Sequence, residues 1–313
     1  MSKRHRYHIR NWGDYNRALV ERGRITLWFS EEAIQKWHKT ERTGKRGRPK
    51  LYSDLAIQCA LTLRALFCLP LRATEGFVDS LIKLLKLSIC APDYTTLCLR
   101  QKKLEVCLPR KNKRRELDIV VDSSGLKVYG EGEWKVRQHG YSKRRTWRKI
   151  HLAVDPSSAE IEAISVTTND FKDSELLPDL LSTIDGKIKN VSGDGGYDSL
   201  DNYEYLGNLG ANPLILPRKD AIINKHGNCH SPPLLRDEVI RKIRKIGRKT
   251  WKKNSGYHQR SLAETAIYRL KTIFGDKLSA RNFSSQAQEV FIRCIALNKM
   301  TKLGMPDSYK VII

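Results

Sequence analysis

The sequence predicts an α/β protein, in which an all-helical N-terminal region precedes a mixed-sheet domain with a basic insertion before a late helix. Two observations support this. Apolar residues recur at helical spacing between residues 53 and 104, and from residue 117 short β-branched runs come first alone and then alternate with helical patterns. Strands that are followed by alternating strands and helices are typical of a mixed sheet.

Composition fits a globular protein that binds a polyanion. The chain has 313 residues, of which 40% are apolar, enough for one large domain or two modest ones. Lys and Arg exceed Asp and Glu by 24. Because such an excess favours binding to phosphates through counterion release, nucleic acid is the expected partner, but the chemistry stays open.

Cysteine usage and hydropathy indicate the compartment. The seven cysteines are odd in number and form no C-x-x-C pair, so we expect a reducing compartment without a disulfide framework. The basic start is not followed by an apolar stretch of the secretory kind, and no run of about 18 apolar residues predicts a membrane span. A cytoplasmic location is the expectation.

Residues 1–50 read as a basic arm that ends in KRGRPK. Arg46 and Arg48 in this motif could lie extended in a narrow A/T minor groove. A basic Gly-Pro linker is the alternative, and the motif alone favours the linker.

Residues 51–110 read as a helical domain. Ser53 is a predicted N-cap for a helix that runs up to Pro70, residues 73–87 form a second amphipathic run, and Asp93 can cap a third helix through residue 104. The third is polar and basic, so the three suggest a helix-turn-helix whose recognition element carries Thr95, Thr96 and Arg100. A plain helical packing domain is the open alternative.

The sheet is predicted from residue 117 onward. We expect a buried strand that ends at Asp122 and a later strand that reaches Asp194, so both acids would lie at the edge where open α/β sheets bind ligands. The remaining predicted elements are strands at 125–129, 147–154, 161–167 and 212–216, and helices at 173–183 and 198–209.

The insertion, residues 218–256, is polar and basic. Between Arg236 and Lys253 the sequence has nine cationic residues and only two acidic ones. This imbalance favours a nucleic-acid-facing helix over a solvated amphipathic one. A helix at residues 285–302 would complete the core.

The stretch YHQRSLAETAIYRLK, residues 257–271, is predicted to form a helix with one charged face and one apolar face. On a helix that starts near Arg260, the side chains of Arg260, Glu264 and Lys271 lie within about 40° of each other, while the apolar residues face a core. Taken alone, this pattern is equally well explained by a routine stabilising ion pair.

Three blocks in this order carry a family resemblance. The motif Y-x2-R-x3-E-x6-K at Tyr257, VVDSSGLKVYGEGEWKVRQHG around Asp122 and VSGDGGYD around Asp194 resemble DDE transposases of bacterial insertion sequences, in particular the family-five group. The likeness runs from about residue 11 to residue 306.

The resemblance implies a fold and a site. Residues 111–313 would form a ribonuclease-H-like catalytic domain, and residues 51–110 would bind the DNA ends. Asp122, Asp194 and Glu264 would be the catalytic carboxylates and would hold two Mg²⁺ or Mn²⁺ ions, which prefer hard oxygen ligands. Tyr257, Arg260 and Lys271 would contact DNA. Five other acids compete for the same role, of which Asp118, on the same face of its strand as Asp122, is the strongest, and the rest are Asp155, Asp170, Asp173 and Asp198.

The implied function is a DNA transposase in the bacterial cytoplasm, associated with the nucleoid. It would bind terminal inverted repeats, make metal-dependent 3′-end cleavages and join the ends to target DNA, as a dimer or larger assembly. The alternatives are a ribonuclease-H-like nuclease or resolvase that cuts without joining, and a non-catalytic DNA-binding regulator.

Overall fold

The computed structural model describes residues 5–39, 51–104, 106–108, 116–128, 147–225 and 232–312. The chain divides into two compact units, one made of Met1–Val106 with Phe291–Ile313 and the other of Cys107–Val290. The sequence predicts instead a boundary near residue 110 with everything after it in one domain. The difference arises because the long C-terminal helix, read as core of the sheet domain, contributes its second half to the N-terminal unit.

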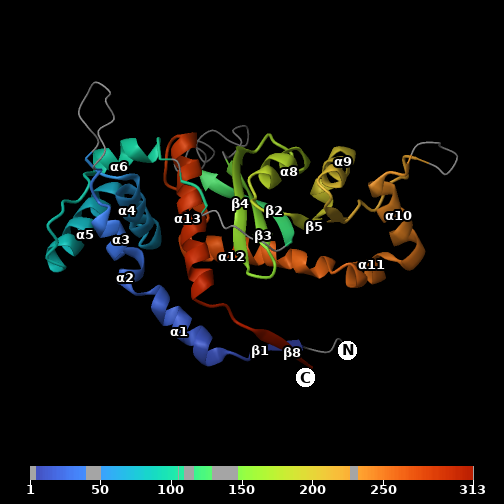
Figure 1. Ribbon diagram of the computed structural model, residues 1–313, viewed down its shortest axis with the longest axis horizontal. Helices are drawn as coiled ribbons and strands as arrows, with labels where there is room; N and C mark the ends of the chain where they lie inside the picture. The colour runs from blue at the N-terminus through green and yellow to red at the C-terminus, as the bar shows by residue number, and fades with distance from the viewer. Residues whose placement is uncertain are drawn as a thin grey trace, which may run out of the picture. The chain divides into compact units, whose positions relative to one another are not determined.

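The N-terminal unit is built from helices and one two-stranded ribbon. Its elements are β1 (His5–Ile9), α1 (Trp12–Arg22), α2 (Ile25–Trp28), α3 (Glu31–Gln35), α4 (Asp54–Leu66), α5 (Leu71–Leu84), α6 (Tyr94–Gln101), the second half of α13 (Phe283–Leu303) and β8 (Ser308–Ile312). Strands β1 and β8 pair antiparallel, so the two ends of the described chain lie side by side (Figure 1).

Most of the N-terminal segment is folded and is not the basic arm that its polarity suggested. Trp37 is fully buried, and its ring nitrogen donates to the Cys90 carbonyl at 2.8 Å. Phe29 packs edge-on against Trp37, with ring centroids 5.5 Å apart. A few large aromatic side chains thus tie a charged segment to the helices that follow. Arg46 and Arg48 lie outside the described residues.

Helices α4, α5 and α6 form as their start signals predict. The Ser53 hydroxyl accepts from the Ala56 amide at 3.0 Å, and the Asp93 carboxylate accepts from the Thr96 amide at 2.8 Å, so both N-caps are confirmed. No single helix among the described residues is long and apolar enough to cross a membrane; α4 and α5, bent by 111°, satisfy that criterion only as a pair and only by length and composition.

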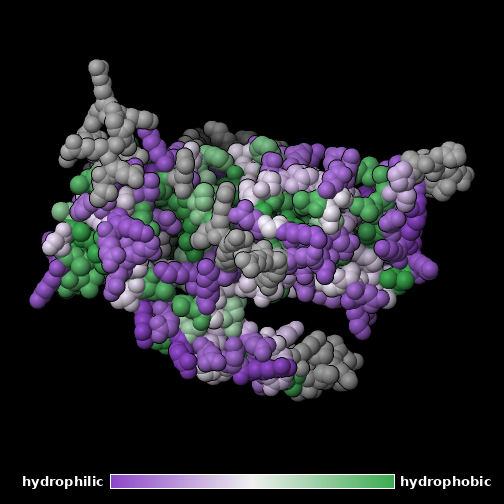
Figure 2. Space-filling model, in the orientation of Figure 1, coloured by the Kyte–Doolittle hydropathy of each residue, from purple (hydrophilic) through white to green (hydrophobic). Residues whose placement is uncertain are grey.

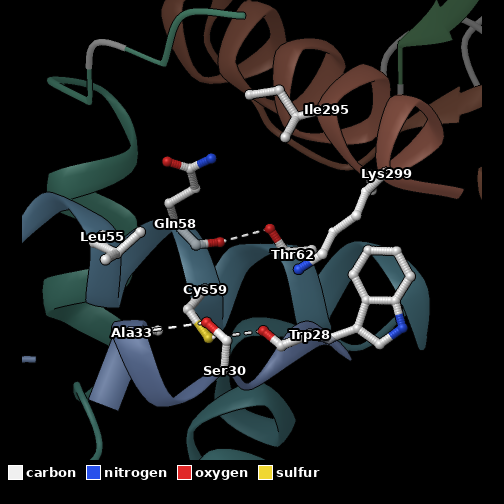
Figure 3. A pocket seen from close by; sticks show the side chains of 10 residues that line it. Trp28, Ser30, Ala33, Leu55, Gln58, Cys59, Thr62, Ile295 and Lys299 are labelled. Carbon is white, nitrogen blue, oxygen red and sulfur yellow. Dashed lines mark hydrogen bonds between the residues drawn. The ribbon is translucent and has the colours of Figure 1, made fainter. Parts of the chain in front are cut away.

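A pocket of about 110 Å³ opens in this unit beside α4 and α13 (Figure 3). Lys299 extends along the Trp28 ring, 5.5 Å from its centroid, and its ammonium donates to the Leu27 carbonyl. The Cys59 thiol donates to the Trp28 carbonyl at 3.3 Å. The polar groups of the pocket wall therefore largely hold α2 against α4 and α13.

The second unit is organised around a mixed sheet of β2 (Leu117–Val128), β3 (Trp147–Asp155), β4 (Glu160–Thr168), β5 (Ile188–Gly193), β6 (Asn212–Ile215) and β7 (Lys277–Leu278). The strand order is β4-β3-β2-β5-β6, with β7 pairing β2. The first three strands are antiparallel neighbours, whereas β5 is parallel to β2 and β6 is parallel to β5. This is a mixed sheet, as the order of strand and helix patterns in the sequence predicts.

One strand prediction is wrong. The sequence suggested two strands separated at Asp122, whereas β2 is continuous and pairs with β3 from Val120 to Lys127. The Ser-Ser-Gly run after Asp122 looks like a turn, but pairing with β3 keeps it extended. Gly125 gives room for the Trp147 ring, since a Cβ there would lie 3.2 Å from it. Asp122 is therefore inside a strand and not at its end.

Helices cover the sheet. α8 (Asp173–Ser182) contacts β3 and β4, and α12 (Ser261–Phe274) contacts β2 and β3 (Figure 1). The odd-numbered residues Ile119 and Val121 join a buried cluster with Leu177 of α8 and with Tyr203 of α9 (Leu200–Asn208). Since side chains alternate along a strand, the even-numbered residues of β2, Asp122 included, point to the other face.

The insertion contains two helices, α10 (Leu235–Ile246) and α11 (Arg248–Asn254), which meet at a bend (Figure 1). Gly247, with φ of 82°, ends the first and starts the second, a conformation that favours glycine. Val239 and Trp251 are buried in the core cluster beside α9. The surface over α10 is mostly hydrophilic (Figure 2).

Candidate active site

Strand register brings Asp122 and Asp194 to neighbouring positions. In the parallel pair β2 and β5, Val120 lies opposite Ser192. Asp122 follows the first by two residues and Asp194 follows the second by two, so both continue the same face of adjacent strands. The two acids are 72 positions apart in sequence, with β3, β4 and α8 between them, and only the fold brings them together.

Asp194 is fixed by the turn that it begins. It caps the single 3₁₀ turn of Gly195–Tyr197, and its carboxylate accepts from the Gly196 amide at 2.8 Å. A Cβ on Gly193 would lie 3.1 Å from a Val121 methyl and 3.0 Å from the Tyr197 ring. The glycines therefore allow the turn to pack closely beside β2.

Asp122 is much more enclosed than Glu264, with a side chain only 15% exposed against 50%. The Asp122 pKa is raised to about 6, chiefly by burial and to a lesser extent by the negative charges of Asp194 and Glu264, against the lowering effects of a Ser123 backbone hydrogen bond and of Arg260. Removal from solvent is thus the main reason why this carboxylate holds its proton more tightly than usual.

Glu264 is delivered by the first turn of α12. Its carboxylate, 50% exposed, forms an ion pair with Arg260, which ends the preceding 3₁₀ turn, Tyr257–Arg260. The same guanidinium lies 4.0 Å from the Asp122 carboxylate. Arg260 therefore stands between the carboxylates of β2 and α12.

Lys271 lies two turns beyond Glu264 on the same helix face. Its ammonium donates to the Ser124 hydroxyl at 2.6 Å. Ser124 follows Asp122 by two residues, so it shares that face of β2. The predicted common face of Arg260, Glu264 and Lys271 is confirmed as a geometry, and it is turned toward the carboxylate face of the sheet.

Tyr257 is placed differently from its predicted use. The resemblance implied a contact with DNA, but only 6% of the residue is exposed, and its ring packs against Trp251 with centroids 5.8 Å apart. Lys252 lies over the same ring, 5.3 Å from its centroid. Burial raises the pKa of its hydroxyl. The ring thus anchors the start of α12 to the insertion.

Most competing acids have structural partners. Asp118 accepts from the Asn190 amide at 2.7 Å and lies four residues, about 13 Å, along β2 from Asp122. Asp155 accepts from the hydroxyls of Ser157 and Ser158 at the turn after β3. The Asp198 side chain is fully buried and pairs with Arg236 at 2.7 Å. None of these three is free to face Asp122.

The predicted DNA-reading residues of α6 are engaged within the N-terminal unit. The hydroxyls of Thr95 and Thr96 both donate to Asp93, and these bonds lower the Asp93 pKa to about 2. Arg100, with a side chain 11% exposed, donates to the Tyr52 carbonyl at 2.9 Å and pairs with Asp54. These contacts support the helical packing alternative for Arg100, while DNA binding through α6 stays a prediction.

Three residues near the site were missed as participants by sequence reasoning, namely Ser124, Tyr197 and Lys149. Ser124 could have been found from its place two residues after Asp122, had the strand been read as continuous. The Tyr197 hydroxyl is buried and has no hydrogen-bond partner among the described residues, and the charges of Asp173, Asp122 and Asp194 help burial to hold its pKa well above the usual range. Lys149 carries no sequence signal for its partner, because that partner comes from α8.

The donor set fits a divalent cation. Within the residues that the structure describes, no three His, Cys, Asp or Glu side chains are gathered closely enough to hold a metal ion. The carboxylates of Asp122, Asp194 and Glu264 are nevertheless the hard oxygen ligands that Mg²⁺ and Mn²⁺ prefer, and the charges of Asp194 and Glu264 both act on Asp122. Glu264 would have to exchange its ion pair with Arg260 for the metal.

Comparison with known proteins agrees with this geometry. A family model described as "Transposase DDE domain" matches residues 113–299, and a second model of the same description matches residues 20–131. Among solved structures, the chain is similar to a piggyBac transposase synaptic complex with hairpin DNA, at 11% identity over 91% of this chain and 74% of that one, with a TM-score of 0.40. It is also similar to a Drosophila P element transposase strand transfer complex, at 9% identity over 87% and 85%, with a TM-score of 0.31.

The first match spans more than half of the chain and includes Asp122, Asp194 and Glu264. DDE transposases are DNA-transposing enzymes that use divalent metal ions. The chain belongs to this family of DDE transposases.

Proposed function

We propose that this transposase binds the terminal inverted repeats of an insertion sequence, hydrolyses one strand at each end to expose a 3′-OH, and joins those ends to target DNA. The observation that carries the proposal is the meeting of Asp122 and Asp194 on adjacent parallel strands, beneath a helix that brings Glu264, Arg260 and Lys271 to the same face. Water would be the nucleophile in the first step and the freed hydroxyl in the second.

Asp122, Asp194 and Glu264 are the residues that would hold two Mg²⁺ or Mn²⁺ ions. When bound, such ions activate the attacking oxygen and stabilise the leaving oxygen of an in-line displacement. The role of the protein in this chemistry is to hold the three carboxylate ligands in place. Asp122, with a pKa of about 6, is mostly ionised at neutral pH and so is available as a ligand without a strong base nearby.

Arg260 and Lys271 would bind the phosphates on either side of the scissile bond. Both lie on the carboxylate face, where Arg260 pairs with Glu264 and lies 4.0 Å from Asp122, and Lys271 donates to Ser124. If Glu264 binds a metal, the Arg260 guanidinium loses this partner, and its N–H donors become available for bidentate contact with a phosphate. Binding of the metal and binding of DNA would then support each other through Arg260.

The insertion would add a phosphate-binding surface made of lysines. The arginines of α10 and α11 have partners within the protein: Arg241, Arg244 and Arg248 donate to backbone carbonyls of residues 217–225, and Arg236 pairs with Asp198. The exposed cations that remain on α10 and α11 are lysines, namely Lys242, Lys245, Lys249 and Lys253. Charges with few internal partners are the ones that can neutralise DNA phosphates.

Two ends must be joined in one event, so we infer a dimer or larger assembly on paired ends, working in the bacterial cytoplasm at the nucleoid. The test is an assay with the purified full chain and labelled DNA that carries the inverted repeats flanking its coding region, with Mg²⁺ or Mn²⁺. Nicking that exposes 3′-OH ends, followed by joining to a target plasmid, supports the proposal. Cutting without joining would favour a nuclease, and binding without metal-dependent chemistry would favour a regulator.

A further inference from the structure

Asp173, one of the five competing acids, comes from another element and lies against the turn that Asp194 begins. It is the first residue of α8, and its side chain is 21% exposed. The usual explanation for an acid at this position is a favourable interaction with the helix dipole. Its contacts indicate a more specific role.

The carboxylates of Asp173 and Asp194 flank the same residue. A Cβ on Gly196 would lie 2.9 Å from Asp194 Oδ1 and 3.2 Å from Asp173 Oδ2, so these two oxygens are separated by no more than the sum of those distances. The Gly196 amide donates to Asp194 at 2.8 Å. Asp173 thus lies close to the turn that Asp194 caps.

Lys149 is held by Asp173. Its ammonium lies 2.7 Å from Asp173 Oδ1 and donates to the Phe171 carbonyl at 3.4 Å. Both side chains of the pair are less than a quarter exposed, so solvent screens their attraction only in part. His151, 3.5 Å from the same oxygen, has a pKa lowered to about 4 by burial and is neutral near pH 7. Lys149 is therefore the positive group that balances Asp173.

We propose that Asp173 is a positioning residue of the metal site, which acts through Asp194. It keeps the Lys149 ammonium engaged and away from Asp194, and its own charge adds to the negative potential at the turn. Without Asp173 the lysine is free to pair with Asp194 and to compete with a divalent cation for that carboxylate. This inference rests on the proposed function, because it concerns the metal affinity of the same carboxylates.

The experiment measures Mn²⁺ affinity of the full-length protein on end DNA by electron paramagnetic resonance of free Mn²⁺, which does not depend on turnover. We expect Asp173→Asn to weaken Mn²⁺ binding by about tenfold or more, the usual cost of losing a group that orients a ligand, with end-DNA affinity unchanged. Lys149→Gln alone should retain or tighten Mn²⁺ binding. The double variant should recover most of the loss, since no free ammonium remains.

If the Asp173–Lys149 pair only stabilised the fold, Lys149→Gln would weaken Mn²⁺ binding as much as Asp173→Asn does, and the double variant would recover none of the lost affinity. Either result overturns the inference. Asp179→Asn, an exposed acid on the same helix, is the matched control. Asp173→Ser replaces Asp173→Asn if circular dichroism shows that the latter does not fold.

Failure of the inference and failure of the proposed function are distinguishable. If wild-type protein binds Mn²⁺ and cleaves ends while Asp173→Asn binds Mn²⁺ equally well, only the role of Asp173 is wrong. If wild-type protein neither binds Mn²⁺ nor cleaves verified ends, the proposed function fails and the inference fails with it.

Discussion

Arg260 lies 4.0 Å from the Asp122 carboxylate while it is paired with Glu264 four residues later on the chain. One guanidinium thus links the strand that carries the enclosed Asp122 to the helix that carries the exposed Glu264. The arrangement gives Arg260 an electrostatic role in the protein that is separate from any contact with DNA.

Arg260→Gln should move the acidic limb of the cleavage pH profile to higher pH. Arg260 lowers the pKa of Asp122, so its removal lets that pKa rise above its present value of about 6, and protons then compete with metal up to a higher pH. The measurement is single-turnover cleavage against pH at fixed Mg²⁺. Arg281→Gln, an exposed arginine outside the site, is the control. An unshifted limb would show that Arg260 does not act on Asp122.

Asp122→Asn should stabilise the metal-free protein at neutral pH. The folded pKa of about 6 lies above the ordinary value of 3.8, so the folded chain binds this proton more tightly than the unfolded chain does. Stability is therefore lost as pH rises between these values, and the penalty is fully present above pH 6. Replacing the acid should recover roughly 3 kcal/mol near pH 8 and almost nothing near pH 4.

Urea unfolding in EDTA at the two pH values checks this prediction, with Asp179→Asn as the control. A variant that is less stable than wild type at the higher pH would mean that the Asp122 charge is already well compensated in the fold.

Gly196→Ala should lower cleavage while leaving the fold and end binding intact. The new methyl group would lie 2.9 Å from Asp194 Oδ1, closer than such atoms approach, so the carboxylate must shift. A shift of this kind at a catalytic group costs on the order of a hundredfold in rate. Gly195→Ala is a matched control, because its nearest neighbour would be the Leu216 carbonyl at 3.5 Å. Equal rates for the two variants would contradict the close fit around Asp194.

Removing the exposed insertion lysines should make DNA binding less dependent on salt. Each lysine that no longer neutralises a phosphate lowers the slope of log affinity against log salt by about 0.9, so Lys242, Lys245 and Lys249 changed together to Gln should reduce it by roughly 2 to 3. The same change at Lys172, Lys187 and Lys189, elsewhere in the sheet unit, removes equal charge and should leave the slope nearly unchanged. Fluorescence anisotropy over a salt series measures both. Equal slopes in the two triple variants would place DNA elsewhere on the protein.

Much of the architecture is readable from the sequence because local signals agree with the fold. Ser53 and Asp93 cap their helices as expected, and the mixed sheet follows from the order of strand and helix patterns. The helix face shared by Glu264 and Lys271 follows from spacing alone, since 3.6 residues per turn fix it.

The features that could not be predicted from the sequence depend on contacts between residues that are distant in the chain. The Ser-Ser-Gly run after Asp122 has turn composition, and only its pairing with β3 makes it a strand. Tyr257 reads as a solvent-facing motif residue until Trp251 is seen against its ring. Arg100 looks like a recognition residue because nothing local reveals Tyr52 and Asp54 as its partners. The role that we propose for Asp173 depends on its ion pair with Lys149 and on its closeness to Gly196, and these two residues lie on separate elements.

The most direct test of the proposed site is metal-dependent strand cleavage and joining by Asp122→Asn, Asp194→Asn and Glu264→Gln, compared with Asp118→Asn. All four substitutions remove one carboxylate charge, and Asp118 lies on the same strand and face as Asp122 but is bonded to Asn190. We predict that the first three variants bind end DNA yet lose cleavage and joining, while Asp118→Asn keeps both. Cleavage that survives in any of the first three, or that is lost with Asp118→Asn alone, would contradict the assignment of the three carboxylates.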